Sequence, residues 1–200
     1  MAIEEINFNK LCSVRGRKED DFEEFVIQLA ELQSIPNAIE FTRLDNPDGG
    51  LECFWELKDG SIIGWQAKFF INKIGSDQFD QIEDSLDSAL KNYNLKEFII
   101  VIPKNLTKNQ NKLKNKRIKK WKNFENARDD LEIKFWCLSD IIEIIRTKKL
   151  EGFRSFWFGE LELPDFWFEK LSEDIPRNLI YFWMKFFIII DFNNIVKLFL

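Results

Sequence analysis

Two strand-like segments near the middle of the chain carry three polar side chains in otherwise apolar surroundings. Residues 47–68, PDGGLECFWELKDGSIIGWQAK, read as two aromatic strands, 51–57 and 62–70, joined across KDGS. Glu52 lies in the first strand, and Gln66 and Lys68 lie in the second. Carboxylate and amide oxygens are ligands that Mg²⁺ accepts, and an ammonium group can orient water or stabilise charge on a phosphate. Together these residue types suit metal-assisted hydrolysis of a phosphodiester bond.

The register of the two strands decides whether these side chains meet, because a slip by one residue turns a whole strand over. We favour an odd-length connection, Asp59-Gly60-Ser61, which sends Glu52, Gln66 and Lys68 to one face, with Glu52 opposite Lys68. The other face then holds only apolar residues and cysteine, in the pairs Leu57–Ile63, Trp55–Trp65, Cys53–Ala67 and Leu51–Phe69. A two-residue Asp59-Gly60 turn remains an alternative. An ordinary cross-strand pair of Glu52 and Lys68 would also use this geometry.

The composition narrows the chemistry. The 200 residues include no histidine, which excludes Ser-His-Asp and Cys-His catalysis and histidine-bound metals. Three cysteines, Cys12, Cys53 and Cys137, have no metal-ligand spacing, and the chain opens without a signal peptide, so we expect a cytoplasmic location. Hydrophobic residues make up 45% of the chain, enough for the core of one ordinary domain.

Hydrophobic periodicity predicts an alternation of helices and strands. Beside the two strands above, we expect helices at 18–34, 76–92 and 140–150 and strands at 38–44, 97–103 and 131–139, with a further helix in the basic segment 104–122. This order predicts an α/β fold, with a mixed central β-sheet flanked by helices on both faces.

The end of the chain differs from the rest. We expect the domain to span residues 1–150 and residues 151–200 to form an aromatic-rich, apolar extension, either packed, leading to a further domain, or associated with a membrane. Lys185 and Asp191 interrupt its longest apolar run, so we expect no membrane span.

The basic segment is the second candidate site. The net charge is −5, yet residues 104–122 carry nine Lys and Arg and no acid. Such a run is either a solvated helix face or a surface that faces phosphates. The candidate nucleic-acid contacts are Lys112, Lys114, Lys116, Arg117, Lys119 and Lys120.

The motifs also carry a family resemblance. DGGLE, followed after a hairpin by WQAK, resembles the PD-(D/E)xK nuclease superfamily in its Mrr-like restriction endonuclease branch, where Gln replaces the second acid. The resemblance covers roughly residues 15–140. More narrowly, RG ahead of FEEF, DGGLECFWEL, GWQAKFF, VIPKNLT and FWFGE are similar to the N-terminal nuclease module of bacterial antiphage STAND NTPases.

The resemblance implies a restriction-endonuclease-like fold and an endonuclease that cleaves double-stranded DNA with Mg²⁺, or with Mn²⁺ in its place, in antiviral defence. It implies Gln66 as a metal ligand and Lys68 as the lysine that orients water or stabilises the phosphate. The acid of the motif falls on Asp48 in the turn or Glu52 in the strand, and the register argument favours Glu52. A further acid falls on Glu23, because helical spacing groups Glu24 with Gln28 and Glu31 on an expected solvent face.

Two other interpretations stay open. The chain could be a non-catalytic module that keeps the nuclease fold and binds nucleic acid or a protein. A nuclease of this type could also act only as a homo-oligomer, or when attached to an NTPase or sensor module.

Overall fold

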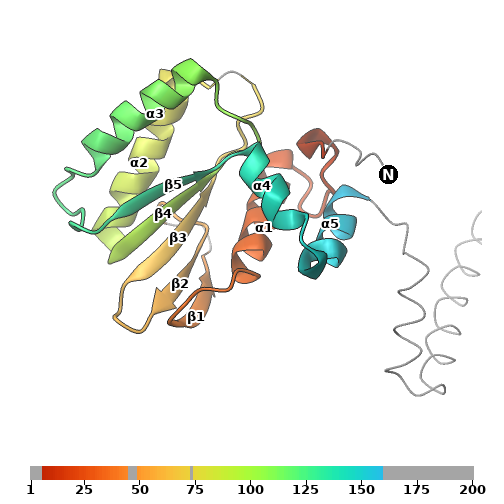
Figure 1. Ribbon diagram of the computed structural model, residues 1–200, viewed down its shortest axis with the longest axis horizontal. Helices are drawn as coiled ribbons and strands as arrows, with labels where there is room; N and C mark the ends of the chain where they lie inside the picture. Colours follow the sequence, from red (N-terminus) through yellow and green to blue (C-terminus); the bar gives the residue numbers. More distant parts are fainter. Residues whose placement is uncertain (1–5, 45–48, 73, 160–200) are drawn as a thin grey trace, which may run out of the picture. The chain divides into compact units, whose positions relative to one another are not determined.

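A five-stranded mixed sheet forms the centre of the protein (Figure 1). The computed structural model describes residues 6–44, 49–72 and 74–159. The strands lie side by side in chain order: β1 (Ala38–Arg43), β2 (Cys53–Leu57), β3 (Ile62–Ala67), β4 (Leu95–Val101) and β5 (Glu132–Trp136). β1, β2 and β3 pair antiparallel, whereas β3, β4 and β5 pair parallel. The carboxyl ends of β1, β3, β4 and β5 therefore lie together, at what we call the carboxyl end of the sheet.

Helices cover both faces of the sheet, as the sequence predicts (Figure 1). On one face lie α1 (Lys18–Glu31), α4 (Leu138–Ile145) and α5 (Glu151–Phe158), with the short 3-10 helices Phe8–Lys10 and Lys148–Leu150. On the other face lie α2 (Ser76–Asn92) and α3 (Lys108–Trp121). None of the helices in the described part of the chain is long and apolar enough to cross a membrane.

Each face has its own apolar core. On the α1 face, Phe22, Phe25 and Leu29 come from successive turns of α1 and are fully buried against strand residues such as Trp65. α5 joins this core through Trp157, whose ring lies 5.7 Å from that of Phe25, and the compact unit ends at Gly159. On the α2–α3 face, the buried side chains include Phe79, Ile82, Leu86, Phe98 and Trp121.

The predicted order of elements is confirmed, while several boundaries move by a few residues. β2 starts at Cys53 rather than 51, β3 ends at Ala67 rather than 70, and β4 runs two residues ahead of the predicted strand. The strand predicted at 131–139 ends at Trp136, because α4 begins at Leu138. Asp140 accounts for this early start: its carboxylate accepts a hydrogen bond from the N–H of Cys137 at 2.8 Å.

The β2–β3 register keeps the predicted faces but not the predicted partners. Trp55 pairs with Ile63 and Cys53 with Trp65, a shift by two residues from the expected pairs. The loop comprises 58–60 instead of 59–61: the N–H of Leu57 donates to the carbonyl of Ser61 at 2.8 Å. A shift by two preserves the side of every residue. Cys53, Trp55, Trp65 and Ala67 accordingly share the α1 face.

The predicted position of Leu51 is wrong. Leu51 is buried in the α2–α3 core and not on the tryptophan face, because it precedes β2 and does not follow its alternation. The chain reaches this position through Gly50, where φ is +93° and the backbone lies against α2. An added Cβ at Gly50 would lie 2.0 Å from the carbonyl oxygen of Ser85. Only glycine fits this contact, which sets where β2 begins.

We therefore expect Gly50→Ala to destabilise the fold by about 3 kcal/mol or more, because backbone atoms of α2 would have to move. Gly16 has the same φ of +93° with nothing within 4 Å of an added Cβ. Gly16→Ala isolates the backbone strain and should cost about 1–2 kcal/mol. Urea unfolding measures both variants, and equal losses would contradict the close approach at Gly50.

Candidate functional site

Glu52 and Gln66 meet on the α2–α3 face, at the carboxyl end of the sheet. The amide Nε2 of Gln66 donates a hydrogen bond to the carboxylate Oε1 of Glu52. Glu52 keeps 6% and Gln66 3% of the accessible surface, so both polar groups are buried. Burial of such groups is unfavourable unless they are paired. The sequence analysis predicted that these two residues share a face, and the structure brings their side chains into contact.

The oxygen of the Gln66 amide lacks the hydrogen-bond partner that its NH₂ group has, among the residues described. Its Nε2 also approaches the carbonyl of Ala67 at 3.3 Å, but its Oε1 is buried without a hydrogen-bond partner among the residues described. An unsatisfied buried acceptor costs about 1–3 kcal/mol. A divalent cation coordinated by this oxygen and by the Glu52 carboxylate would remove that cost.

These oxygens fit Mg²⁺, which is commonly held by one or two carboxylates while it keeps several waters. No group of three or more Asp, Glu or Cys side chains gathers for a metal within 6–44, 49–72 and 74–159. Asp48, the other predicted ligand, lies outside the described residues. The described donor set is therefore one carboxylate and one amide oxygen.

Lys68 follows directly after β3 and is half-buried. Its backbone N–H donates to the carbonyl of Val101 at 3.0 Å, which extends the pairing of β3 with β4 beyond Ala67. Strand alternation places Lys68 on the same side of the sheet as Gln66. The main chain of β4 thus holds Lys68 next to the buried pair.

The expected solvent position of Glu24 is wrong. Glu24 keeps only 7% of its accessible surface and accepts hydrogen bonds from Arg15, Gln28 and Arg43, at 2.5, 2.8 and 2.5 Å. Burial raises the pKa of Glu24, but these hydrogen bonds and the two positive charges outweigh it and hold the pKa below its ordinary value. The segment before α1 and the end of β1 cover a helix stripe that looks exposed when α1 is considered alone.

Glu23, the acid that the resemblance implies, is half-buried on α1. α1 packs on the face of the sheet opposite to Gln66. Glu23 therefore lies in the helix layer on one face of the sheet, whereas the Glu52–Gln66 pair lies on the other face.

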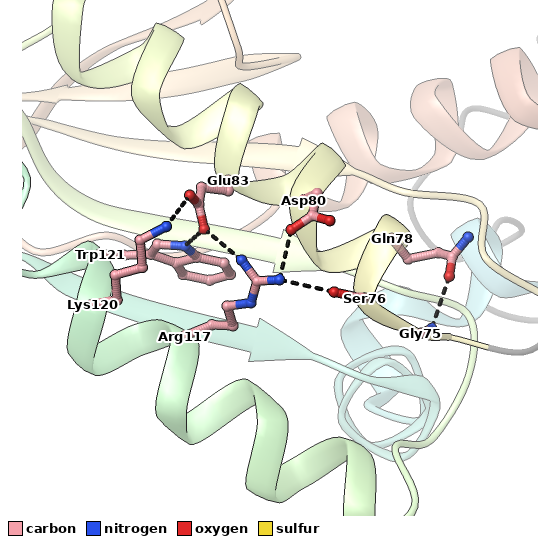
Figure 2. A network of polar contacts seen from close by, with 8 residues as sticks. All are labelled: Gly75, Ser76, Gln78, Asp80, Glu83, Arg117, Lys120 and Trp121. Carbon is pink, nitrogen blue, oxygen red and sulfur yellow. Dashed lines mark hydrogen bonds and ion pairs between the residues drawn. The ribbon is translucent and has the colours of Figure 1, made fainter.

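The predicted cations of α3 divide into two groups. Arg117 and Lys120 face α2, where they bond to Glu83 at 2.9 and 2.5 Å, and Arg117 also bonds to Asp80 at 2.6 Å (Figure 2). Glu83 further accepts a hydrogen bond from the indole Nε1 of the fully buried Trp121, at 2.7 Å. These two cations therefore join α3 to α2.

The second group faces outward. Lys112, Lys116 and Lys119 are exposed and have no ion pair within the described ranges, and Lys114 is half-buried 5.5 Å from the Phe135 ring. Their spacing adds Lys108, one turn before Lys112, to the same side of the helix. We call Lys108, Lys112, Lys116 and Lys119 the lysine stripe. The sequence analysis missed Lys108, although the helix start at Thr107 would have revealed it: the Thr107 N–H donates to Gln110 Oε1 at 2.8 Å.

The lysine stripe starts near the carboxyl end of the sheet. Gln110, in the first turn of α3, donates to the carbonyl of Ile74 at 2.7 Å. Lys104, just ahead of α3, donates to the carbonyls of Ile71 and Asn72 at 3.2 and 2.7 Å. Because these carbonyls belong to the segment that follows Lys68, the first turn of α3 lies on the chain segment next to the candidate site.

The Glu83 contacts yield a test of this division. Burial raises the pKa of Glu83, but hydrogen bonds from Lys120, Trp121 and Arg117 outweigh it and lower the pKa below 4.5. A carboxyl group with a lowered pKa stabilises the fold above its unfolded pKa and loses that effect as the pH falls through its folded pKa.

Glu83→Ala should therefore reduce the unfolding free energy by about 1–3 kcal/mol near neutral pH. Glu83→Gln, which keeps an acceptor for Trp121 but no charge, should lose less. The difference between wild type and Glu83→Gln should shrink below about pH 4.5. Urea unfolding at several pH values checks this, and a difference independent of pH would contradict a structural ion pair.

A buried acid–amide pair, an adjacent lysine and a stripe of lysines thus occur on the α2–α3 side of the sheet. Comparison with known proteins finds no matching family model, no matching curated protein and no matching solved structure. The functional interpretation therefore depends on the residues and geometry of this chain.

Proposed function

We propose that the protein is an Mg²⁺-dependent endonuclease that hydrolyses phosphodiester bonds of double-stranded DNA. The main support is the buried Glu52–Gln66 pair, whose amide oxygen finds no hydrogen-bond partner in the described part of the chain, beside the half-buried Lys68. A strand that served only the core would carry apolar residues at these positions. The combination of hard oxygen ligands with an ammonium group suits an anionic substrate.

The residues have separate roles in this proposal. Glu52 and Gln66 would hold the cation, with Asp48 as a further candidate acid, whereas Glu23 lies on the other side of the strands and has no part in holding it. A bound Mg²⁺ or Mn²⁺ ion would supply a more acidic water and would neutralise charge on the scissile phosphate. Lys68 holds its ammonium charge next to that phosphate, where it stabilises the charge that builds up as the bond to the leaving oxygen breaks.

The lysine stripe holds the DNA backbone. From Lys108 to Lys119 the helix rises by about 16 Å, comparable to about five phosphates of one strand at roughly 3.4 Å each along the DNA axis. Lysines in such a row position the duplex but do not read its sequence. Arg117 and Lys120 contribute indirectly, because their ion pairs to α2 fix the orientation of α3.

The family resemblance adds a setting to this chemistry. We propose that the nuclease acts in antiphage defence, as a homo-oligomer or under the control of an NTPase or sensor module. DNA cleavage that depends on such assembly would be weak in the isolated chain and stronger when copies are brought together.

A non-catalytic nucleic-acid-binding module is the second candidate. It is favoured by the lysine stripe, which needs neither a metal nor Lys68 to contact phosphates. Such a module would bind duplex DNA with steep salt dependence and would leave it intact with Mg²⁺ or Mn²⁺.

Lys68→Ala should lower Mg²⁺-dependent cleavage of duplex DNA by about 100-fold or more, because loss of one preorganised charge at the transition state has that magnitude. The matched control is Lys58→Ala, since Lys58 is exposed in the loop at the opposite end of β2 and β3. Gel assays of plasmid cleavage, together with circular dichroism, measure activity and fold. Unchanged cleavage by Lys68→Ala would refute the proposed role.

Metal binding can be tested without catalysis. Mg²⁺ or Mn²⁺ should raise the unfolding midpoint of the wild type. The unfolding free energy should increase by about 2.7 kcal/mol when the metal concentration is one hundred times the dissociation constant. Gln66→Leu removes the amide oxygen and should abolish this rise. Gln81→Leu, at an exposed position of α2, should keep it. A metal-dependent rise that survives in Gln66→Leu would place the cation elsewhere.

A further inference from the structure

We propose that Arg15 and Arg43 form a clamp for a phosphate of the nucleic-acid backbone, on the α1 side of the carboxyl end of the sheet. This inference rests on the proposed function. It concerns a different face from that of Glu52 and Gln66, and it names two contacts that the lysine stripe does not supply.

The two arginines converge on one buried carboxylate. Arg15 comes from the segment before α1 and Arg43 from the last position of β1, and each bonds to Glu24 through its Nη2 at 2.5 Å. A guanidinium group has five N–H donors. No other side-chain hydrogen bond of Arg15 or Arg43 occurs within the described residues. Most of their donors therefore remain available.

The charge of this group is not balanced. One carboxylate bonds to two guanidinium groups, so these three side chains carry a net charge of about +1, since arginine stays protonated. Asp20 lies near Arg15 and Glu31 near Arg43, but neither bonds to these arginines. The arginine side chains are 47% and 44% exposed, whereas that of Glu24 is 10% exposed. The positive charge is therefore the part that reaches solvent, and a phosphate oxygen is the acceptor that paired guanidinium forks suit best.

Buried polar groups of α1 hold the arginines in place. Asp21 is fully buried, and its Oδ1 accepts hydrogen bonds from the N–H groups of Val14 and Arg15 at 2.8 and 2.7 Å. One turn later, Glu24 is itself fixed by Gln28, whose Nε2 donates to Glu24 Oε1 at 2.8 Å. Partly exposed ion pairs contribute little stability. These contacts hold the Arg15 backbone and the Glu24 carboxylate in place before any ligand binds, which reduces the ordering cost of binding.

The clamp lies at the same end of the sheet as the candidate site. Arg43 pairs with Cys53, which pairs with Trp65, the residue before Gln66. The N–H of Leu44, next to Arg43, donates to the carbonyl of Glu52 at 3.0 Å. A nucleic-acid backbone that crosses this end of the sheet would contact the clamp on the α1 face and Lys68 on the other.

The test measures binding of the full chain to a duplex of arbitrary sequence, without divalent cations, over a series of salt concentrations. The slope of log affinity against log salt should fall by about 1 for Arg15→Ala or Arg43→Ala, and by about 2 for the double variant. Arg128→Ala is the matched control, because Arg128 is paired with Asp130 at the opposite end of the sheet and should leave the slope unchanged. Arg15→Gln and Arg43→Gln, which keep a donor for Glu24, give the same readout if the alanine variants unfold.

Each outcome decides a separate claim. A double variant that binds with the slope of the wild type would refute the clamp and leave the proposed function standing. A wild type that does not bind duplex DNA at all would refute the proposed function and the clamp with it. Inorganic phosphate at matched ionic strength should weaken duplex binding of the wild type and of the double variant to the same extent. Stronger competition against the wild type would assign the clamp to a free anion and overturn the assignment to the backbone.

Discussion

The buried hydrogen bond between Gln66 and Glu52 joins β3 to the residue before β2 at the carboxyl end of the sheet. A buried carboxylate and a buried amide each need a hydrogen-bond partner, and here each provides one for the other. This contact favours the register in which β2 and β3 meet. β3 is paired on both sides, by β2 and by β4, and cannot shift on its own. Gly50 then allows the start of β2 to pack on α2, which brings Glu52 to its partner.

Charged residues elsewhere divide into those that hold the fold and those that face outward. Glu83 binds Arg117, Lys120 and Trp121 and thereby orients α3 so that its lysines point to solvent. Glu24 has the corresponding position on the other face, where it orients Arg15 and Arg43. In both cases a mostly buried carboxylate determines where positive charge is presented. The fold and the proposed nucleic-acid surface are therefore set by the same side chains.

Most of the fold follows from local sequence patterns, and part of the site does too. Apolar periodicity predicts the order of helices and strands, and the parity of the hairpin predicts that Glu52 and Gln66 share a face. The observed pairing differs from the predicted one by two residues. Both pairings keep the same apolar face, and they differ only in whether the loop comprises 58–60 or 59–61. Side-chain alternation does not distinguish such registers.

Contacts between distant segments were beyond this kind of prediction. Glu24 looks solvent-exposed on a helical projection, and only the packing of Arg15 and Arg43 over α1 buries it. In the sequence, the basic residues of α3 likewise look like one exposed surface. In the structure, Arg117 and Lys120 face α2 and form ion pairs with its acids. In each case the deciding partner comes from another element of the chain, so local periodicity carries no information about it.

The central claim is that Glu52 and Gln66 hold a divalent cation at the carboxyl end of the sheet. Crystals soaked in Mn²⁺ and measured for anomalous scattering test it most directly. The account predicts an anomalous peak within about 2.0–2.3 Å of a Glu52 carboxylate oxygen and of Gln66 Oε1, as expected for oxygen ligands. An intact Gln66–Glu52 hydrogen bond with no peak beside it, at a Mn²⁺ concentration that supports DNA cleavage, would contradict the account.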